Sequence, residues 1–379
     1  MMPAQANQVS DDSIMIRSSV LVVTPGDVLY SCIGHAFIRM ECPTYGLDYC
    51  FTCESESVRQ KVLTFLAGHL KMGMMAIPTG ELLNLYASEK RGVSEYNLNL
   101  TLEQNRRLWE LLDNTVAKGM DLPYDYIQRG CALSCYRIIM ETIQRDGAVE
   151  HRWPAHFYMT RRELVSRQMG DFPWTAFMLY SLVGKEADKS VPFDDKVVTP
   201  RDLLEVLQLT TVNKSQLLDN EGSVLIEAAE PAAGGDCELP SPLICSWVVL
   251  VICICSILKK SSLHEYLLLV LQFSIGLFLF YLIFCSSLPC TEWNWLFIPF
   301  NPLPVFTWRW RKTWAAVYAA ALLVWLLAML LSPHQLVDSA YLMLAFCLLI
   351  TCLNIHVKLN TKLSCLRIET SVSAKASES

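Results

Sequence analysis

Four long apolar runs in the C-terminal part of the chain restrict its fold more than any other feature. They cover residues 242–258, 266–286, 313–331 and 336–355, and Asp338 is their only charged residue. A helix needs about 20 apolar residues to cross the hydrocarbon core of a bilayer. Backbone polar groups in lipid must be paired within their own element, so each run is expected to be a helix. The sequence therefore predicts a transmembrane bundle of about four spans over residues 242–357.

The first 240 residues have the mixed charge and patterning of a sizeable soluble domain. The formal net charge of −6, with no basic stripe, argues against nucleic acid as a partner. We divide this part into a flexible N-terminus (1–17), an α+β domain (18–150), a helical extension (151–227) and a linker (228–241). The residues after the bundle (358–379) are predicted to form a disordered polar tail.

Two sequence signals disagree about the side of the membrane on which the soluble domain lies. Residues 3–6 (PAQA) resemble the small-residue end of a secretory signal cleaved after Ala6, although an accidental match in a tail explains them equally well. A signal would place the soluble domain outside the cytoplasm. The positive-inside rule instead favours a cytoplasmic soluble domain, because basic residues lie at Lys259, Lys260, Arg309, Arg311, Lys312, Lys358, Lys362 and Arg367.

Cysteine spacing predicts no metal site, and no cofactor is expected. Cys50 and Cys53 form a C-x-x-C pair, but no second pair lies at the distance that zinc ligands require. A disulfide among Cys42, Cys50 and Cys53 remains open.

Short elements are predicted through the α+β domain. Residues 18–23 and 34–40 read as strands, and the turn Pro43–Gly46 leads to a return strand over 47–52. Helices are predicted over 55–70 and 80–89, and a strand over 93–100. Thr101 and Gln104 form a capping box that begins a helix to about residue 117. A further helix begins near Cys131 and ends near residue 145.

Three residues of this domain suggest nucleophilic catalysis. Cys131 stands at a predicted helix start, where the helix dipole favours a thiolate. His35 begins a strand and can take the thiol proton, and Asp48 on the hairpin partner can orient the imidazole. A lone cysteine and a lone histidine are more often structural residues, so the pattern alone leaves both readings open. Cys135, one turn further on, is a rival nucleophile.

Several ordered segments resemble the Lnb family of bacterial proteins, which have an extracytoplasmic N-terminal domain and a C-terminal membrane bundle. The opening motif is residues 24–39 (TPGDVLYSCIGHAFIR), which resembles the family's "GD…YS…GHT…R" pattern. Further matches follow in order at 46–51 (GLDYCF), 91–100 (RGVSEYNLNL), 124–132 (YDYIQRGCA), 172–174 (FPW), 199–204 (TPRDLL) and 294–302 (NWLFIPFNP).

The resemblance implies an α+β papain-like domain of the NlpC/P60-like, circularly permuted type, followed by the helical bundle. It implies lipoprotein N-acyl transfer: an acyl chain moves from a phospholipid through a Cys thioester to the α-amino group of a diacylglyceryl-cysteine. Cys131 matches the family's nucleophile, His35 matches its base, and Asp48 stands where a third polar residue is expected. Gly130 replaces the asparagine that commonly precedes the nucleophile, which affects the assignment of the oxyanion hole.

The resemblance also implies partners and a location. The partners are a phospholipid donor, a diacylated lipoprotein acceptor and the membrane. The location is the bacterial inner membrane, with multiple spans and a periplasmic N-terminal domain. Substrate-binding residues are expected at Tyr124, Tyr126, Trp293, Trp295 and Arg309; the tryptophans and the arginine are equally explained as a membrane-interface belt.

Two other functional classes remain open. One is a membrane-anchored cysteine peptidase or amidase acting on cell-wall peptides, and the other is a non-enzymatic membrane scaffold.

Overall fold

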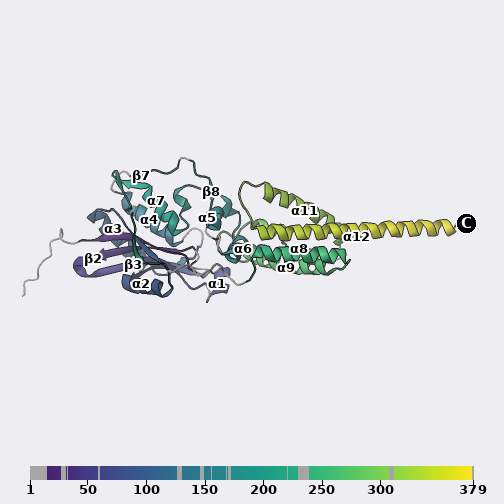
Figure 1. Cartoon of the computed structure of the whole chain (residues 1–379), viewed down its shortest axis with the longest axis horizontal. Coiled ribbons are helices and arrows are strands. Elements are labelled where there is room, and N and C mark those ends of the chain that lie inside the picture. Colours follow the sequence, from purple (N-terminus) through teal and green to yellow (C-terminus); the bar gives the residue numbers. More distant parts are fainter. Residues whose placement is uncertain are drawn as a thin grey trace, which may run out of the picture. The chain divides into compact units, whose positions relative to one another are not determined.

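The computed structural model divides into two compact units (Figure 1). It describes residues 15–26, 31, 33–58, 60–125, 130–145, 149–154, 156–167, 169, 172–219, 221–228, 239–306 and 311–377, without the side chains of 311–312 and 359–377. The soluble unit comprises Met1–Phe172, Lys189–Asp236 and Ser287–Pro289. The membrane unit comprises Pro173–Asp188, Cys237–Ser286 and Cys290–Ser379.

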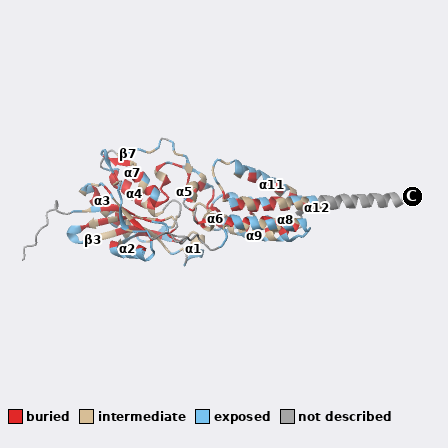
Figure 2. Cartoon of the chain, viewed as in Figure 1, coloured by how far each residue is buried: buried red, intermediate tan, exposed pale blue. Residues whose placement is uncertain are grey.

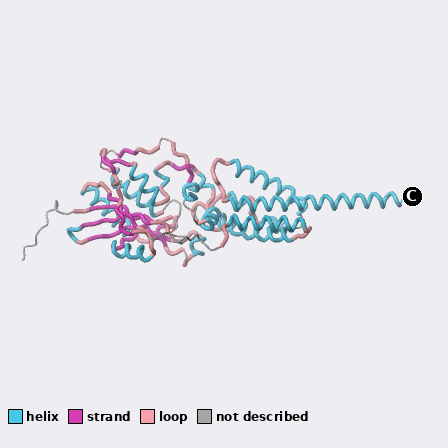
Figure 3. The backbone as a smooth tube through the Cα atoms, in the orientation of Figure 1, coloured by secondary structure: helices cyan, strands magenta, loops and turns pink. Residues whose placement is uncertain are grey.

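A seven-stranded antiparallel sheet forms the centre of the soluble unit (Figure 3). Its strand order is β12-β5-β1-β2-β3-β4-β6. The bounds are β1 Arg17–Val23, β2 His35–Cys42, β3 Leu47–Ser55, β4 Lys71–Pro78, β5 Val93–Asn97, β6 Leu122–Pro123 and β12 Ser223–Ile226. The 3-10 turn η2 (Pro43–Tyr45) joins β2 to β3, and Gly46 ends it at a φ of 64°. That left-handed conformation suits glycine, which has no Cβ.

Helices cover both faces of this sheet (Figures 1 and 2). On one face, buried side chains of β2 pack with those of α3 (Leu102–Ala117), α4 (Cys131–Ile143) and α7 (Pro200–Gln208) in the larger core. On the other face, α2 (Thr79–Ser88) packs through Leu82 and Tyr86 against Phe37. Successive residues of β2 alternate between these two cores, as the pleat of a strand requires.

Short elements complete the soluble unit. A small sheet has the order β11-β10-β7, and β8 pairs with β9. The bounds are α1 Val62–Leu66, β7 Val149–His151, β8 Met159–Thr160, α5 Arg161–Arg167, β9 Ser190–Val191, η4 Asp194–Lys196, β10 Thr210–Val212 and β11 Ser215–Gln216.

Local signals predicted some of these elements and missed others. The Thr101–Gln104 capping box is present at the start of α3, and Thr199 and Asp202 form another at α7. The predicted helix over 55–70 is wrong: β3 continues to Ser55, only Val62–Leu66 is helical, and a strand that was not predicted, β4, begins at Lys71.

The membrane unit contains long apolar helices. Their bounds are α8 Pro242–Leu258, α9 Leu263–Phe284, α11 Arg311–Leu331 and α12 Ser339–Ser377. Within the described residues, three segments are long and apolar enough to cross a membrane, namely Leu263–Phe284, Thr313–Leu331 and Ser339–Lys358. The first predicted span, α8, is a shorter apolar helix of 17 residues. Three of the four predicted spans are therefore long enough to cross a membrane, and the remaining one is this shorter helix.

Shorter elements lie with these helices: α6 (Pro173–Leu182), η3 (Lys185–Asp188), η5 (Trp295–Phe297) and α10 (Leu303–Phe306). We predicted that residues 151–227 extend the soluble domain, but Pro173–Asp188 cluster with the membrane unit. The tail predicted to be disordered is helical, because α12 continues to Ser377.

Polar contacts define two ends of the membrane unit. At the first, which we call the α6 end, Asn294 Nδ2 donates to the carbonyls of Tyr180 and Ser181 at 3.2 and 2.9 Å. The Tyr341 hydroxyl, near the start of α12, donates to the carbonyl of Phe177 in α6 at 3.3 Å.

At the second, which we call the Lys358 end, Lys358 Nζ lies 3.4 Å from Glu265 Oε1. His264, at the start of α9, contacts Ser256 of α8 at 2.8 Å and Asn354 of α12 at 3.1 Å.

Candidate active site

His35 stands at the first position of β2, where the backbone leaves a tight turn. Gly34 has a φ of +82°, and a Cβ there would come within 2.6 Å of the carbonyl oxygen of Val23. Only glycine fits this position without strain. The register then places His35 opposite Val23 at the end of β1, so the imidazole lies where two central strands of the sheet end.

Cys131 is the first residue of α4, and Gly130 is its N-cap. The N-cap supplies no side-chain acceptor for the first turn of the helix. The backbone N–H groups of Ala132 and Ala36 donate to the sulfur. The buried face of α4, with Leu133, Cys135 and Ile139, anchors the helix in the core. A half-buried thiol therefore sits among backbone donors that favour negative charge.

His35 and Cys131, both predicted from sequence, form a hydrogen-bonded pair. Burial opposes ionisation of Cys131, but the charge and hydrogen bond of His35 and the two backbone donors lower the pKa of Cys131 below its ordinary value. Burial likewise opposes the charge on His35, yet the Cys131 thiolate and Glu54 raise the pKa of His35 to about 10. The pair therefore favours thiolate and imidazolium near neutral pH.

Glu54 and Thr52, near the end of β3, hold the other side of the imidazole. His35 Nε2 lies 2.7 Å from Thr52 Oγ1 and 3.4 Å from Glu54 Oε1. The Thr52 hydroxyl donates to Glu54 Oε1 at 2.9 Å, so it accepts from Nε2–H. Burial raises the pKa of Glu54, but His35 and Thr52 outweigh it and lower that pKa. With Nε2 engaged in this way, Nδ1 is the ring nitrogen left to face Cys131.

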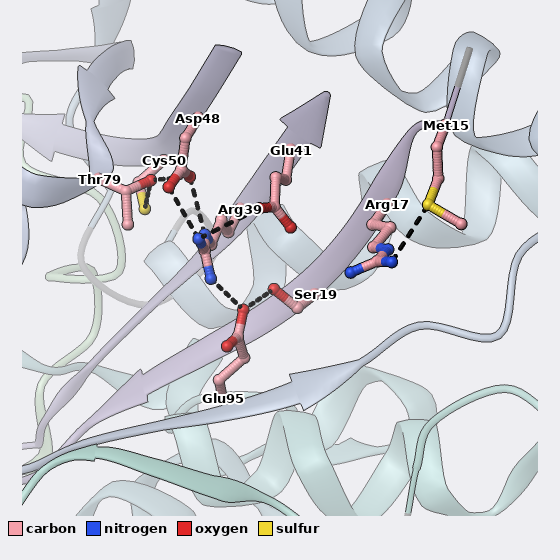
Figure 4. Close-up of polar contacts among 9 residues, drawn as sticks. All are labelled: Met15, Arg17, Ser19, Arg39, Glu41, Asp48, Cys50, Thr79 and Glu95. Atoms are coloured by element: carbon pink, nitrogen blue, oxygen red, sulfur yellow. Dashed lines mark hydrogen bonds and ion pairs between the residues drawn. The ribbon is translucent and has the colours of Figure 1, made fainter. Parts of the chain in front are cut away.

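Asp48, the predicted orienting residue, lies elsewhere (Figure 4). It accepts from Arg39 Nε at 2.8 Å and from Arg39 Nη2 at 2.7 Å, and Thr79 Oγ1 donates to it at 2.5 Å. Arg39 Nη1 also donates to Glu95 at 3.0 Å. Six residues of extended chain, about 20 Å, separate Asp48 from Glu54. The prediction for Asp48 is therefore corrected: the carboxylate at His35 is Glu54.

The hairpin register explains why Glu54 was missed and how it can be found. Cys42 pairs with Leu47 and Ile38 pairs with Phe51. Extending this register by three residues places Glu54 opposite His35, whereas Asp48 pairs with Glu41. Opposite residues of an antiparallel pair share a face of the sheet. The predicted return strand ended at residue 52, so Glu54 fell outside it.

Two further thiols lie close to Cys131, and both are held neutral. Cys135, the rival nucleophile, is fully buried, and its sulfur is directed at the carbonyl of Ala36 at 3.7 Å. Burial and the nearby Cys131 and Cys53 raise the pKa of Cys135 well above its ordinary value. Burial also raises the pKa of Cys53, despite a hydrogen bond with Ser134. Cys131 is the thiol of this group with a lowered pKa.

The residues predicted to bind substrate belong to both units of the chain. In the soluble unit, half-buried Tyr124 donates its backbone N–H to the carbonyl of Leu70 and packs 6.0 Å from the ring of Phe65. In the membrane unit, Trp293 is 69% exposed, and Trp295 Nε1 donates to Asp188 at 3.0 Å. Tyr126 and Arg309 lie outside the described residues. Among the described residues, no cluster of His, Cys, Asp or Glu is suited to hold a metal ion.

Comparison with protein families identifies both halves of the chain. Residues 5–167 match the Lnb N-terminal periplasmic domain, and residues 236–363 match the Lnb transmembrane domain. The chain belongs to the Lnb family. It is therefore a membrane protein with a periplasmic N-terminal domain, and the His35–Cys131 pair of this Lnb protein lies within that domain. No curated protein and no solved structure gave a match.

Proposed function

We propose that this Lnb protein is a cysteine-dependent lipoprotein N-acyltransferase. The observation that carries the proposal is the hydrogen-bonded Cys131–His35 pair at the start of α4, in a domain joined to transmembrane helices. A thiolate among backbone donors is suited to attack an ester and to stabilise the resulting oxyanion. The proposal includes a papain-like fold in a permuted order, because the strand of His35 precedes the helix of Cys131.

In the first half-reaction, the Cys131 thiolate attacks an acyl ester of a phospholipid. The backbone N–H of Ala132 and that of Ala36 lie beside the sulfur and are the candidate oxyanion donors. As the tetrahedral intermediate collapses, His35 gives its proton to the leaving alkoxide, and a lysophospholipid departs. The products are an acyl thioester on Cys131 and a neutral imidazole held by Thr52 and Glu54.

In the second half-reaction, the α-amino group of a diacylglyceryl-cysteine attacks the thioester. His35 takes the amine proton, the Cys131 thiolate leaves, and an amide forms. The imidazolium and thiolate are thereby restored. Glu54 stabilises the imidazolium in both halves, which is the role of the carboxylate in a catalytic triad.

The membrane unit suits a lipid substrate better than a cell-wall peptide. Moving an acyl chain of about 16 carbons from the bilayer into water costs on the order of 12 kcal/mol, at about 0.8 kcal/mol per methylene. A catalytic domain fused to apolar helices allows the chain to stay in an apolar environment. A peptidase or amidase would have no such need.

The proposal includes several membrane crossings. With these crossings, the basic residues near the helix ends no longer conflict with a soluble domain outside the cytoplasm. Lys259 and Lys260 follow α8, next to the Lys358 end. α11 begins at that same end, because its residue Trp314 and Ile355 of α12 line one cavity. Residues 285–294 and 332–338, near the α6 end, contain no lysine or arginine. The positive-inside rule then places the Lys358 end in the cytoplasm and the α6 end outside.

Cysteine labelling tests this arrangement. Gln335 and Ser261 are exposed residues near the α6 end and the Lys358 end. A single cysteine at Gln335 should react with an impermeant maleimide in intact cells, and one at Ser261 should react only after permeabilisation. The reverse pattern would place the soluble unit in the cytoplasm and exclude lipoprotein maturation.

A transfer assay tests the function. The full-length protein in phospholipid vesicles is mixed with a diacylated lipopeptide that has a free N-terminal amine. One acyl chain should be added to that amine, with an equal amount of lysophospholipid formed. Cys131→Ser should abolish transfer, and the matched control Cys135→Ser should retain it. Fatty acid release without acylated peptide would identify a lipase, and cleavage of cell-wall peptides without lipid turnover would identify the amidase.

A further inference from the structure

An irregular segment, residues 294–306, runs through the membrane unit between its two ends. Asn294 contacts α6 at one end, and Leu303 lines a cavity with Ile355 near the Lys358 end. The segment contains only the short helices η5 and α10, separated by Pro299 and Pro302. Unlike α9 and α11, it crosses the unit without a continuous helix.

Polar side chains of the long helices donate hydrogen bonds to a backbone carbonyl of this segment. Gln272, in the middle of α9, donates to the carbonyl of Pro299 at 3.1 Å, and the Tyr318 hydroxyl of α11 donates to the same oxygen. A Cβ on Gly276 of α9 would come within 2.1 Å of the carbonyl oxygen of Phe300. Irregular backbone is tolerated at membrane depth only where protein groups or water satisfy it. The segment is therefore packed inside the membrane unit and is not a surface loop.

Between this segment and α11 lie two adjoining cavities of about 440 Å³ each. Ile298 and Ala321 line both of them, so the cavities adjoin at these two side chains. Their linings extend along α11 from Trp314 to Met329, about 22 Å at 1.5 Å per residue. We call the two cavities together the α11 groove.

The lining of the α11 groove is apolar on both sides, and its α11 side has several small side chains. Alanines of α11 form much of one wall, at positions 315, 320, 321 and 328. The polar lining residues, Tyr318 and Asn301, direct hydrogen bonds to the backbone carbonyls of the crossing segment. A ligand of this groove therefore has to be apolar, narrow and elongated.

We propose that the α11 groove binds the acyl chain of a membrane phospholipid and, resting on the function proposed above, that this lipid is the acyl donor. The chains of one leaflet fill about half of the roughly 30 Å hydrocarbon core, so a groove of about 22 Å holds a complete chain. The groove runs along Thr313–Leu331, a segment long and apolar enough to cross a membrane, so the acyl chains of the surrounding lipid have direct access to it.

Photocrosslinking in the Cys131→Ser variant tests binding separately from chemistry. The probe is a phosphatidylethanolamine with a diazirine in its acyl chain, reconstituted with the full-length protein. Crosslinks should map to peptides that contain residues 295–304 and 314–329. Ala321→Phe, which fills the junction of the cavities, should reduce these crosslinks at least tenfold. The matched control Leu323→Phe changes an exposed residue that does not line the groove and should leave them unchanged.

Donor selectivity provides the second measurement, with Cys131 intact. In Ala321→Phe, transfer from a donor with 16-carbon chains should fall about tenfold relative to a donor with 8-carbon chains, and Leu323→Phe should keep the wild-type ratio. If acyl transfer occurs but crosslinks map elsewhere and the ratio does not change, the groove assignment is wrong and the function stands. If crosslinks map to the groove but no acyl chain reaches the lipopeptide, the groove binds lipid and the assignment of that lipid as a donor is wrong.

Discussion

The two ends of the β2–β3 hairpin carry acidic residues on the same face of the sheet, but with different basic partners. At one end, Asp48 holds the guanidinium of Arg39 through two hydrogen bonds of 2.8 and 2.7 Å. At the other, Glu54 and Thr52 hold the imidazole of His35, whose opposite side meets Cys131. Arginine keeps its proton at any physiological pH, whereas histidine can give and take one. The basic partner thus makes one end structural and the other suited to proton transfer.

The charges of Asp48 and Glu54 also act on different kinds of groups. Burial raises the pKa of Asp48, but Arg39 and Thr79 more than offset it, so Asp48 stays ionised in a closed network. Glu54 is also held ionised, yet its charge acts on a group that is itself paired with a thiol. A charge change at Glu54 should therefore alter the chemistry of Cys131, and the same change at Asp48 should alter only stability.

The largest effect is expected from removing the base. His35→Ala should lower transfer by about 10²- to 10⁴-fold, because no group remains to move the proton between thiol, alkoxide and amine. The measurement is the rate of N-acylation of the lipopeptide by protein that elutes as wild type in size-exclusion chromatography. Wild-type turnover in this variant would show that Cys131 acts without a histidine base.

A smaller effect on rate is expected at the carboxylate. Glu54→Gln keeps a partner for Thr52 but removes the charge that stabilises the imidazolium, so transfer should fall by roughly tenfold. Asp48→Asn is the matched control at the other end of the hairpin and should transfer within about twofold of wild type. If Asp48→Asn loses more activity than Glu54→Gln, the roles of the two ends are reversed.

The free energy of unfolding should fall more in Asp48→Asn than in Glu54→Gln, which is the opposite of the order expected for activity. Asp48→Asn weakens a part-exposed bidentate ion pair, with a side-chain exposure of 39% at Asp48, and should lower the free energy of unfolding by about 1 kcal/mol. Thermal unfolding of the full-length protein in detergent should show a decrease of a few degrees. A larger decrease for Glu54→Gln would mean that Glu54 is mainly a structural residue.

The pH dependence of alkylation should separate the thiolate from ordinary cysteines. The pKa of Cys131 is lowered and that of His35 is raised to about 10, so the Cys131 peptide should react with iodoacetamide below the pH range of a free thiol. In His35→Ala, burial acts without the opposing charge, and the midpoint should move to higher pH. An unchanged midpoint would indicate that His35 does not stabilise the thiolate.

Sequence patterns predicted the parts of the site that depend on local signals. A turn at Pro43–Gly46 set the hairpin, and a helix start placed Cys131 at an N-terminus. The prediction of Asp48 as the residue that orients His35 was wrong, because the end of a strand has no local signal. Ser55–Leu70 has helical periodicity, yet β3 continues to Ser55 and pairs with β4. Cross-strand pairing decided that boundary, and a single sequence does not reveal it.

The crossing segment in the membrane unit was hidden for a different reason. Its prolines at 299, 302 and 304 break helical periodicity, so the sequence predicts no membrane crossing there. Gln272 and Tyr318, which satisfy its backbone, lie on helices far away in sequence. Long-range hydrogen bonds of this kind have no signature in the segment itself.

Direct detection of the acyl-enzyme tests the central claim, that Cys131 carries the acyl chain. The full-length protein is incubated with phospholipid vesicles without an acceptor, digested, and analysed by mass spectrometry with and without hydroxylamine. The account predicts one acyl chain on the Cys131 peptide, removed by hydroxylamine, absent in Cys131→Ser and present in Cys135→Ser. The thioester should accumulate because a site that excludes water leaves it intact until an amine arrives. An acyl chain on another cysteine, or acylation of the lipopeptide by Cys131→Ser, would contradict the account.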